Sequence, residues 1–513
     1  SSQLGSSFSK SVFSWPSPLG ESTLNRTVQQ GHILVQGHPK VRAMCETEQR
    51  QQPPSNEPAT VCPVSVQLWR IHGHDYDLSS FVKVHPGGAV AIELGQGDDC
   101  TRLFESYHVM NDRHRQVLRK YARAMPDGSC EARSGNLSHS AGASESVFHA
   151  EVKALFRKHF KGCGAGAHKA KSSHAVAMVL VLVGYAAAWL GWLRGSYTAL
   201  LVLPMLAWLV MASLAHDGSH FAVSQRPWVN QLCLYGSTPL YYTDAMWYMQ
   251  HVVSHHLETN NLKGDVDLHH HGAVRWHPEK TKAKSLQGSK NLLWHATAFA
   301  GSTLVLALVQ PLTKFVLPGL FVKLGTPAPR LWGSSEVFER VLDVRLSSGF
   351  ATARRLAVNA LLWAWAAAVP AIPVWAYGAT FKAALFGFYP FIMSSILFMV
   401  VTQCSHIQKE TQTRAALNEE DFFKRQAMTS LDYACGSSLW GFLTGGLNTQ
   451  SLHHVAPSVH SSHYPDLYPQ FYQVCLKHEC APPQAPHIGS ALAKHLRYVY
   501  ELGNGYTLPA PEM

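Results

Sequence analysis

Two pairs of long apolar segments dominate the pattern of hydrophobic and polar positions along this chain. The first pair covers residues 174–193 and 197–215, and the second covers roughly 356–377 and 380–402. Each segment holds about 20 almost uncharged residues, enough for a helix that crosses a hydrocarbon layer of about 30 Å. The second pair is separated only by Gly378 and Ala379, so we expect a tight turn there. The pattern predicts four membrane-spanning helices arranged as two hairpins.

A further apolar stretch, residues 292–323, is interrupted by Pro311, Lys314 and Pro318. We interpret it as an interfacial or re-entrant segment. Outside these stretches the chain is polar, and its mean hydropathy of −0.05 is close to neutral. This combination is typical of polar domains fused to transmembrane helices.

Basic residues flank both predicted hairpins on the same side of the membrane. They are Arg157, Lys158, Lys161, Lys169 and Lys171 before the first hairpin, and Arg340, Arg345, Arg354 and Arg355 before the second. The two hairpin loops carry only Arg194. The positive-inside rule therefore predicts that both termini and all polar segments lie in the cytosol, or in the stroma of a plastid.

The formal net charge of +10 has the same explanation, because basic residues near anionic lipid headgroups favour membrane binding. No basic helix is interleaved with aromatic residues, so the sequence predicts membrane lipids and no nucleic acid as a partner.

Three histidine clusters lie next to the predicted spans. They are His216 and His220, then His251, His255 and His256, and finally His453 and His454, which follow Gln450. Histidines at positions i and i+4 share one face of a helix, and imidazole is a ligand suited to iron, zinc, copper and nickel. Because all three clusters are predicted on one side of the membrane, they can meet. We interpret them as a ligand set for two iron ions.

The N-terminal residues 1–61 are predicted to be a disordered leader. Residues 1–43 hold nine Ser and a single acidic residue, Glu21, as in an organelle transit peptide. A competing interpretation is that translation begins at Met44, which would make the preceding residues an upstream artefact. Residues 45–59 are rich in Gln, Pro and Glu, a composition typical of disorder.

A small polar domain is predicted at residues 62–128. Its run from His72 through His85-Pro86-Gly87-Gly88, followed by the stretch from Gly97 to His108, resembles the cytochrome b5 family over nearly the whole domain. The resemblance implies a small α+β fold that binds a b-type haem, with His85 and His108 as its two axial ligands. Pro86 and the two glycines allow a sharp turn after the first ligand.

Residues 129–172 are predicted to be a linker and a basic juxtamembrane segment, because residues 130–148 are rich in Ser, Gly and Ala. A flexible tether raises the local concentration of an attached domain to about the millimolar range. The membrane domain is predicted at residues 173–490, followed by a C-terminal tail at residues 491–513.

Taken together, residues 62–490 resemble the front-end fatty acyl desaturases that are fused to cytochrome b5. The most diagnostic part is the run from Gly445 to Pro457. At the position of Gln450, front-end and sphingolipid desaturases are similar in having Gln, where other membrane desaturases have His. The resemblance also implies one further iron ligand, His406, in the run Thr402-Gln-Cys-Ser-His406. The implied iron ligands are then His216, His220, His251, His255, His256, His406, His453 and His454, with Gln450 as a weak ligand or a hydrogen-bond donor behind the ligands.

The fold class that follows is an α-helical multi-pass membrane protein with a cytosolic di-iron domain and a small haem domain. The resemblance implies insertion of a cis double bond between the carboxyl group and existing double bonds of a fatty acyl lipid, with a lean to the delta-4 or delta-5 position. The implied cofactors are two non-haem iron ions and a b-type haem, with O2 as co-substrate. Electrons would come from NADH–cytochrome b5 reductase or an equivalent donor.

Three alternatives remain open at this point. A sphingoid long-chain-base desaturase and a fatty acid hydroxylase would use the same ligands, and a non-catalytic membrane haem protein would use only the haem. The acyl carrier is also open among phospholipid, galactolipid and coenzyme A. The expected membrane is the endoplasmic reticulum, or a plastid membrane if residues 1–43 are a transit peptide.

Several other residues have two interpretations. Asp217 either orients a cluster histidine or is a surface carboxylate. Trp247 and Tyr248 either line an acyl tunnel or, more often for such aromatics, only pack. We expect the remaining histidines of interest to be solvated or to lie behind the ligands; they are His269, His270, His271, His460 and His463. The ten cysteines, Cys475 and Cys480 included, are expected to be reduced thiols.

Overall fold

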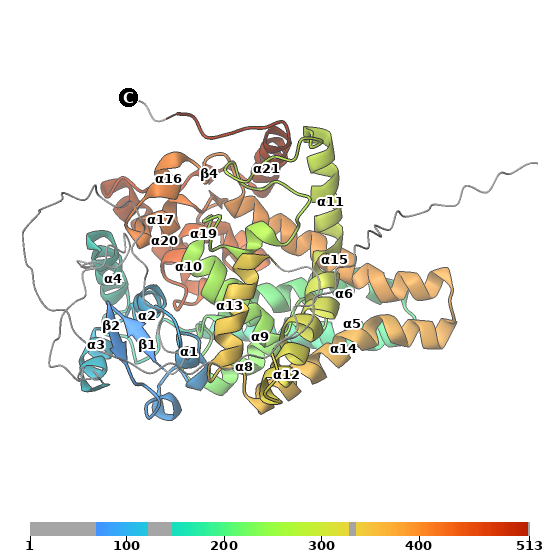
Figure 1. The fold of residues 1–513 in the computed structure, drawn as a ribbon, viewed down its shortest axis with the longest axis horizontal. Coiled ribbons are helices and arrows are strands. Elements are labelled where there is room, and N and C mark those ends of the chain that lie inside the picture. The colour runs from blue at the N-terminus through green and yellow to red at the C-terminus, as the bar shows by residue number, and fades with distance from the viewer. Residues whose placement is uncertain (1–67, 122–145, 328–334, 511–513) are drawn as a thin grey trace, which may run out of the picture. The chain divides into compact units, whose positions relative to one another are not determined.

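The computed structural model describes residues 68–121, 146–327 and 335–510, which form mostly helices (Figure 1). The predicted leader and residues 129–145 of the predicted linker lie outside these residues.

The N-terminal domain combines a small hairpin with short helices. Its strands β1 (Trp69–Ile71) and β2 (His74–Tyr76) are antiparallel, with Trp69 paired to Tyr76 and Ile71 to His74. The two turn residues, His72 and Gly73, both have positive φ, as tight hairpin turns require. The helical elements that follow are η1 (Val82–Val84), α1 (Ala89–Glu93), α2 (Thr101–Tyr107), α3 (Arg113–Leu118) and η2 (Arg119–Tyr121).

The four predicted spans form two helical hairpins. The first pairs α5 (Ser172–Leu193) with α6 (Tyr197–Val210), which continues through the π-helical segment η3 (Met211–Ala215) into α7 (His216–Ser219). The second pairs α14 (Ala353–Tyr377) with α15 (Phe381–His406). Helix α15 also packs against α6. The spans run further toward the polar domain than predicted, so His216 and His406 lie at their ends.

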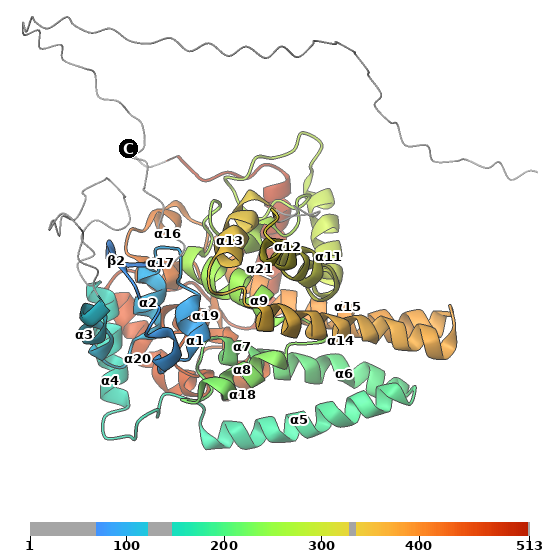
Figure 2. The same cartoon turned by 60° about the horizontal axis from the view of Figure 1, so that its bottom comes forward.

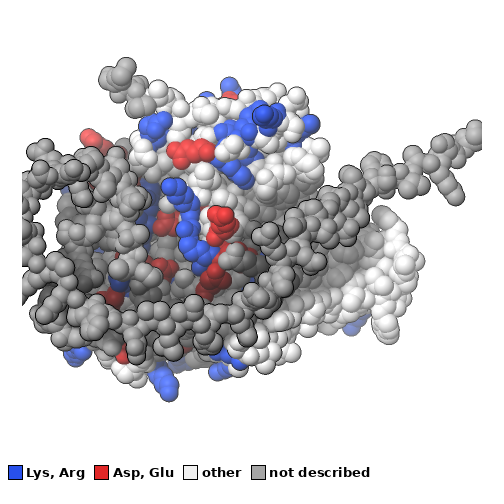
Figure 3. Space-filling view, viewed as in Figure 1, with Lys and Arg blue, Asp and Glu red and all other residues white. Residues whose placement is uncertain are grey.

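Both hairpins project from the rest of the described residues in the same direction (Figure 2). Large apolar side chains on them are exposed, among them Leu180 at 69%, Leu361 at 71% and Trp375 at 88%. The face over the tips of α14 and α15 is mostly free of charged atoms (Figure 3). Such an apolar surface on a helix pair of this length is suited to a lipid bilayer.

A fifth helix is also long and apolar enough to be a candidate span, namely Gly288–Val309. It comprises α11 (Gly288–Leu304) and η6 (Val305–Val309), and the chain continues into η7 (Pro311–Val316) and α12 (Leu317–Lys323). Figures 1 and 2 show α11 running across the direction of the other four helices.

Chain connectivity also argues against a fifth span. His251 precedes α11 and His453 follows α15, yet both belong to one compact group of side chains. Three crossings between them would put these histidines on opposite sides of a membrane. A hydrogen-bonded pair, His295 Nε2 to His495 Nε2 at 3.0 Å, further ties α11 to the polar domain. These observations favour the interfacial interpretation of residues 292–323.

The remaining helices build the polar domain around the inner ends of the spans. Between the hairpins lie α8 (Pro227–Tyr235), α9 (Asp244–Trp247), the π-helical η4 (Tyr248–His255), α10 (His256–Glu258), η5 (Val266–His269) and α13 (Glu336–Ser347). After α15 come α16 (Arg414–Asn418), α17 (Phe422–Met428), α18 (Ser438–Thr444), η8 (Leu447–Thr449), α19 (Gln450–Val455), η9 (Ser461–His463) and α20 (Tyr464–Lys477). Strands β3 (Asp432–Tyr433) and β4 (Gln484–Ala485) form one short parallel pair.

Two segments differ from the expected linker and tail. Helix α4 (Val147–His159), in the predicted linker, packs against α20 and buries Phe148, Val152 and Phe156. Helix α21 (Ile488–Gly503), most of it in the predicted tail, packs against α11. Both helices are amphipathic. Their apolar stripes are shorter than the membrane spans and therefore harder to recognise in the sequence.

We expect Gly445→Ala to destabilise the junction between α18 and η3. Gly445 has φ +63°, and a Cβ there would overlap the carbonyl oxygen of Ala212. Gly436→Ala is the control, because Gly436 has φ +80° but open space around it, so it should cost only the roughly 1–2 kcal/mol of the left-handed conformation. Thermal unfolding in detergent should therefore give a lower Tm for Gly445→Ala than for Gly436→Ala; equal values would contradict this view of the packing.

Candidate metal centre and haem site

The eight predicted iron ligands lie in two adjacent groups. The larger group contains His216, His220, His251, His256 and His453, and the smaller contains His255, His406 and His454. In each group, one ligand nitrogen per residue lies within 4.8 Å of the others. All eight side chains are at most 8% exposed. The structure thus brings together residues from four distant segments of the chain.

The two groups do not follow the three sequence clusters. His255 and His256 are neighbours in sequence but belong to different groups, and so do His453 and His454. The π-helical winding of η4 explains part of this division. In an α-helix a residue five positions on lies well away from the first, whereas the wider π turn, with its i→i+5 bonds, brings it back. His251 can therefore share a group with His256.

The spacing within the larger group fits a metal ion. The Nε2 atoms of His251 and His220 are 3.0 Å apart, those of His251 and His256 are 3.1 Å apart, and those of His256 and His453 are 3.0 Å apart. Two nitrogens that bind one ion at right angles, each at about 2.1 Å, lie about 3 Å from each other. The donor set is also suitable, because imidazole binds iron.

Burial keeps these imidazoles in the form that binds metal. It lowers the pKa of His220, His251 and His256 well below the ordinary value, and neighbouring histidines lower it further. The same causes act on His453 and His454. A neutral imidazole has one nitrogen free for a metal, so the group is ready to bind cations at neutral pH.

Hydrogen bonds at Nδ1 orient two imidazole rings of the smaller group. The Nδ1–H group of His406 donates to the carbonyl oxygen of Thr429 at 3.1 Å, and that of His454 donates to Oε1 of Gln426 at 2.8 Å. In both rings this leaves Nε2 as the ligand atom. Such partners fix the tautomer and the orientation of metal-binding histidines.

Asp265 plays this part for His255, and the sequence interpretation missed it. The His255 Nδ1 atom is 3.2 Å from Asp265 Oδ2 and 3.5 Å from Asp267 Oδ2. Burial lowers the pKa of His255, but the two carboxylates outweigh it and raise the pKa to about 9. The two Asp residues closely following the second cluster were the available signal.

Gln450 lies at the smaller group. Its Nε2 atom is 2.9 Å from His406 Nε2 and 3.2 Å from His454 Nε2, and its buried Oε1 has no hydrogen-bond partner. The side-chain amide therefore reaches the point where the ligand nitrogens of this group converge. A flip of this amide would turn Oε1 instead of Nε2 toward His406 and His454.

Asp217 does not hydrogen-bond a cluster histidine. Its Oδ1 atom is 3.9 Å from His216 Nδ1, whereas its Oδ2 accepts a hydrogen bond from Ser461 Oγ at 2.6 Å and lies 3.2 Å from His460 Nε2. Both acid and histidine are buried. The structure therefore does not support the expectation of a surface carboxylate or of a solvated His460.

The other four histidines hold loops in place or line the cavity described next. His463 is buried, and its Nε2 donates to the carbonyl oxygen of Lys169 at 2.8 Å. His269 Nε2 donates to the carbonyl oxygen of Leu262 at 2.7 Å, and His270 lies 3.2 Å from Asp267. His271 is only partly buried. His270 thus lies behind His255, through Asp267.

A cavity of about 610 Å³ opens beside the histidine groups. It touches His216, His251, His255, His406 and Gln450. Its apolar and aromatic wall includes Trp208, Met211, Tyr242, Trp247, Phe398 and Met399.

Of the two aromatic residues considered from the sequence, only Trp247 lines this cavity. The Trp247 ring stacks on His251 with centroids 4.1 Å apart. Tyr248 is fully buried elsewhere, with its ring stacked on Phe221.

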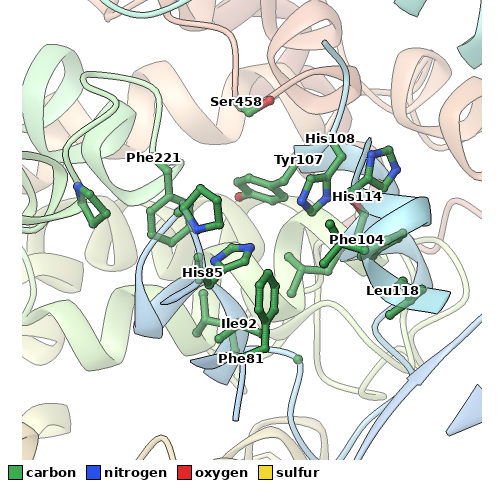
Figure 4. Close-up of a pocket in the computed structure, with 18 of the residues that line it drawn as sticks. Phe81, His85, Ile92, Phe104, Tyr107, His108, His114, Leu118, Phe221 and Ser458 are labelled. Atoms are coloured by element: carbon green, nitrogen blue, oxygen red, sulfur yellow. Dashed lines mark hydrogen bonds between the residues drawn. The ribbon is translucent and has the colours of Figure 1, made fainter. Parts of the chain in front are cut away.

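A second cavity, of about 590 Å³, is lined mostly by the N-terminal domain, and residues of the polar domain such as Phe221 and Ser458 close one side of it. His85 and His108 both line it, and Figure 4 shows their rings reaching into it from separate segments. Their ring centroids are 6.3 Å apart. Imidazole nitrogens bind metals at about 2 Å, so two rings on opposite sides of one ion have centroids about 6 Å apart.

The tautomers of these two histidines also fit a haem. His85 Nδ1–H donates to the carbonyl oxygen of Gly88 at 3.2 Å, and His108 Nδ1–H donates to that of Phe104 at 2.6 Å. Each ring therefore keeps Nε2 for iron. Burial lowers the pKa of His108 to about 3, so its ring is neutral. His114, which the sequence interpretation missed, stacks on His108 with centroids 4.4 Å apart.

Comparison with known proteins agrees with this geometry. Residues 192–482 match the family model for fatty acid desaturases, and residues 65–125 match the model for the cytochrome b5-like heme/steroid binding domain. The chain belongs to the fatty acid desaturase family. It is an oxygen-dependent oxidoreductase with an N-terminal cytochrome b5-like domain.

Three similar proteins share this length and family. An acyl-lipid omega-13 desaturase of Chlamydomonas reinhardtii is 30% identical over 86% of this chain and 94% of its own length. Delta(5) fatty acid desaturase A of Dictyostelium discoideum is 26% identical over 85% of this chain and 90% of its own. A chloroplastic acyl-lipid (7-3)-desaturase of C. reinhardtii is 28% identical over 84% of this chain and 80% of its own. The family implies di-iron chemistry, and the N-terminal domain implies a haem.

We expect Asp265→Asn to weaken iron binding by roughly 10- to 100-fold, because it removes the charged partner of His255. Asp217→Asn is the matched control, since Asp217 is equally buried but makes no hydrogen bond to a cluster histidine. Non-haem iron in purified protein, measured by mass spectrometry after chelator titration, should fall at lower chelator concentration only for Asp265→Asn. Equal retention in both variants would contradict the role given to Asp265.

We expect His108→Ala to abolish the haem absorption band, because His108 is one of two imidazoles that fit the haem axis. His74→Ala changes an exposed histidine of β2 in the same domain and should leave the band unchanged. Absorption spectra of the purified proteins, normalised to protein concentration, test this. An unchanged band in His108→Ala would remove this residue from the haem site.

Proposed function

We propose that this chain is a front-end acyl desaturase. It inserts a cis double bond between the carboxyl group and existing double bonds of a polyunsaturated fatty acyl chain. The new bond is at the delta-4 or delta-5 position, the reaction uses O2, and the electrons pass through the chain's own cytochrome b5-like domain.

The observation that carries the proposal is the pair of buried histidine groups beside a largely apolar cavity. Removing hydrogen from an unactivated methylene requires a strong oxidant, which no side chain supplies, and two iron ions with O2 would supply it. We assign His216, His220, His251, His256 and His453 to one ion, and His255, His406 and His454 to the other. Gln450 completes the second set, and Asp265 orients His255.

The cavity has the chemistry that an acyl substrate requires. Its wall near the histidines is aromatic and apolar, which excludes water and accepts methylenes. Its lining also includes polar side chains, namely Gln250, His270, Lys280, Gln310 and Lys314. An enzyme that counts from the carboxyl end must hold that polar end, and we propose that these residues do so.

The position of the new bond is a separate part of the proposal. The printed names of the relatives give different positions: one is a delta(5) desaturase, and others are omega-13 and (7-3) desaturases. The delta(5) name agrees with the lean toward the delta-4 or delta-5 position. The proposed membrane is the endoplasmic reticulum with the iron site in the cytosol, or a plastid membrane if residues 1–43 act as a transit peptide.

The proposed partners follow from this reaction. They are a fatty acyl lipid, the surrounding membrane lipids, and NADH–cytochrome b5 reductase or an equivalent donor. His85 and His108 would hold the b-type haem, with no open iron position, which favours electron transfer over oxygen binding. No feature of the described residues indicates a nucleic-acid partner.

Expression in yeast tests the function. Cells carrying the chain and fed polyunsaturated acids of various lengths should gain an acid with a new double bond on the carboxyl side, located by mass spectrometry of double-bond derivatives. His453→Ala should abolish the product, because it removes an imidazole from the larger group. His159→Ala changes an exposed histidine outside both groups and should retain the product.

The same extracts separate the alternatives. An unsaturated long-chain base without a new acid would move the assignment to sphingolipids, and a hydroxylated acid would indicate a hydroxylase. A wild-type protein that is loaded with haem and non-haem iron but forms none of these products would contradict the proposal.

A further inference from the structure

The haem cavity and the iron-ligand groups meet at one side chain, Tyr107. Tyr107 is the last residue of α2, directly before His108, and it lines the haem cavity. Its hydroxyl lies 2.7 Å from Nδ1 of His220. Figure 4 shows the Tyr107 ring beside His108 and directed toward Phe221. A single aromatic residue therefore spans from a haem ligand to an iron ligand.

The direction of this hydrogen bond follows from the position of the His220 ring. Its Nε2 faces Nε2 of His251 at 3.0 Å, inside the larger group. In a neutral imidazole whose Nε2 is the ligand, the proton is on Nδ1. His220 Nδ1–H therefore donates to the Tyr107 oxygen. This bond fixes both the tautomer and the orientation of His220, as Asp265 does for His255.

A second contact runs beside the first. Phe221 follows His220 in sequence and lines the haem cavity. Its ring meets that of Tyr107 edge-on, with centroids 5.9 Å apart. The residues adjacent to the two ligands thus pack against each other.

Ionic and polar contacts hold α2 in this position. Arg102 Nη1 donates to Glu258 Oε1 at 2.6 Å and to the carbonyl oxygen of Leu257 at 3.1 Å. These residues directly follow His256 in the larger histidine group. In the segment before α2, Gln96 Oε1 accepts a hydrogen bond from the backbone N–H of Gly349 at 2.8 Å. Helix α2 and the segment before it are thus each held by polar contacts to the polar domain.

We propose that Tyr107 is a positioning residue that joins the two metal sites and provides the connection for electron transfer between them. The inference rests on the proposed function, since it requires both the haem and the iron ions. With both cofactors bound, each transfer would take one electron from a ferrous haem held by His85 and His108, which would become ferric, and would deliver it to a ferric ion held by His220, which would become ferrous. No bond is cleaved and no proton is transferred. The haem is reduced again by an external flavoprotein reductase.

Tyr107→Phe tests this, because it keeps the ring and removes only the hydroxyl. Tyr500→Phe is the matched control: it removes the hydroxyl of an exposed tyrosine of α21 that lines neither cavity. Purified full-length protein, loaded with haem and ferric iron and kept free of oxygen, receives one electron at the haem from a photoreduced deazaflavin. Haem absorbance then follows the loss of that electron to the non-haem iron.

We expect the fast haem reoxidation of the wild type to slow by about tenfold or more in Tyr107→Phe, as is typical when a partner of a metal-binding histidine is removed. Tyr500→Phe should keep the wild-type rate. The haem midpoint potential, measured by spectroelectrochemistry, should be unchanged in both variants, which excludes a change in driving force at the haem. His453→Ala, with its disrupted iron site, gives the background decay.

The rate and the amplitude of the fast phase answer separate questions. The amplitude reports the fraction of molecules that hold iron, and the rate reports the connection within those molecules. A wild-type rate in Tyr107→Phe overturns the inference, whatever the amplitude. A wild-type protein that holds haem and iron but shows no fast phase would instead refute the electron relay of the proposed function.

Discussion

The structure depends on one constraint: eight imidazoles must be buried together, neutral and aimed at common points. Burial keeps the imidazoles of the larger group neutral, because a protonated ring among other imidazoles would lack solvent and would meet like charges. At His255 the neighbouring carboxylates outweigh burial and raise the pKa to about 9. The orientation of each ring needs a further interaction, because an imidazole without a hydrogen-bond partner can rotate. Hydrogen-bond partners at Nδ1 fix this orientation. They include the Thr429 carbonyl for His406, the Asp265 carboxylate for His255 and the Tyr107 hydroxyl for His220. Each partner comes from a different part of the chain, so the site forms only when the whole domain folds.

The membrane hairpins serve this constraint by delivering ligands at fixed positions. His216 and His406 lie where α6 and α15 enter the polar domain, so the packing of these two helices sets their separation. Asn260 then ties the loop after the second cluster to the end of α15, because its Nδ2 donates to the carbonyl oxygen of His406 at 2.9 Å. Its positive φ of 58° is a conformation that Asn tolerates better than most residues. The membrane helices and a few buried polar contacts thus together position the histidines.

The position of the cytochrome b5-like domain changes the meaning of the predicted tether. A flexible linker would only raise the local concentration of an electron donor. In the structure the domain is docked, and Glu105 of α2 forms a buried ion pair with Lys153 of α4 at 2.9 Å and a partly buried one with Arg115 at 2.9 Å. Burial raises the pKa of Glu105, but hydrogen bonds from His72, Arg115 and Lys153 outweigh it and hold that pKa well below its usual range. The segment expected to be a linker is therefore partly a helix that fastens the two domains together.

The sequence by itself predicted the spans, the haem motif and seven of the eight grouped histidines, because hydrophobic length and histidine spacing are local properties; His406 was predicted only from the family resemblance. It also predicted the interfacial placement of residues 292–323, which the crossing direction of α11 supports. Only the tertiary structure decided how the histidines divide into two groups, because the π-helical winding at His251–His256 depends on packing. Sequence reasoning likewise could not predict the hydrogen-bond partners of the histidines, namely Asp265, Gln426 and Tyr107. It also could not predict that helices α4 and α21 dock on the polar domain. Hydrogen bonds between residues far apart in sequence leave no periodic pattern in a single chain, and only folding makes them neighbours.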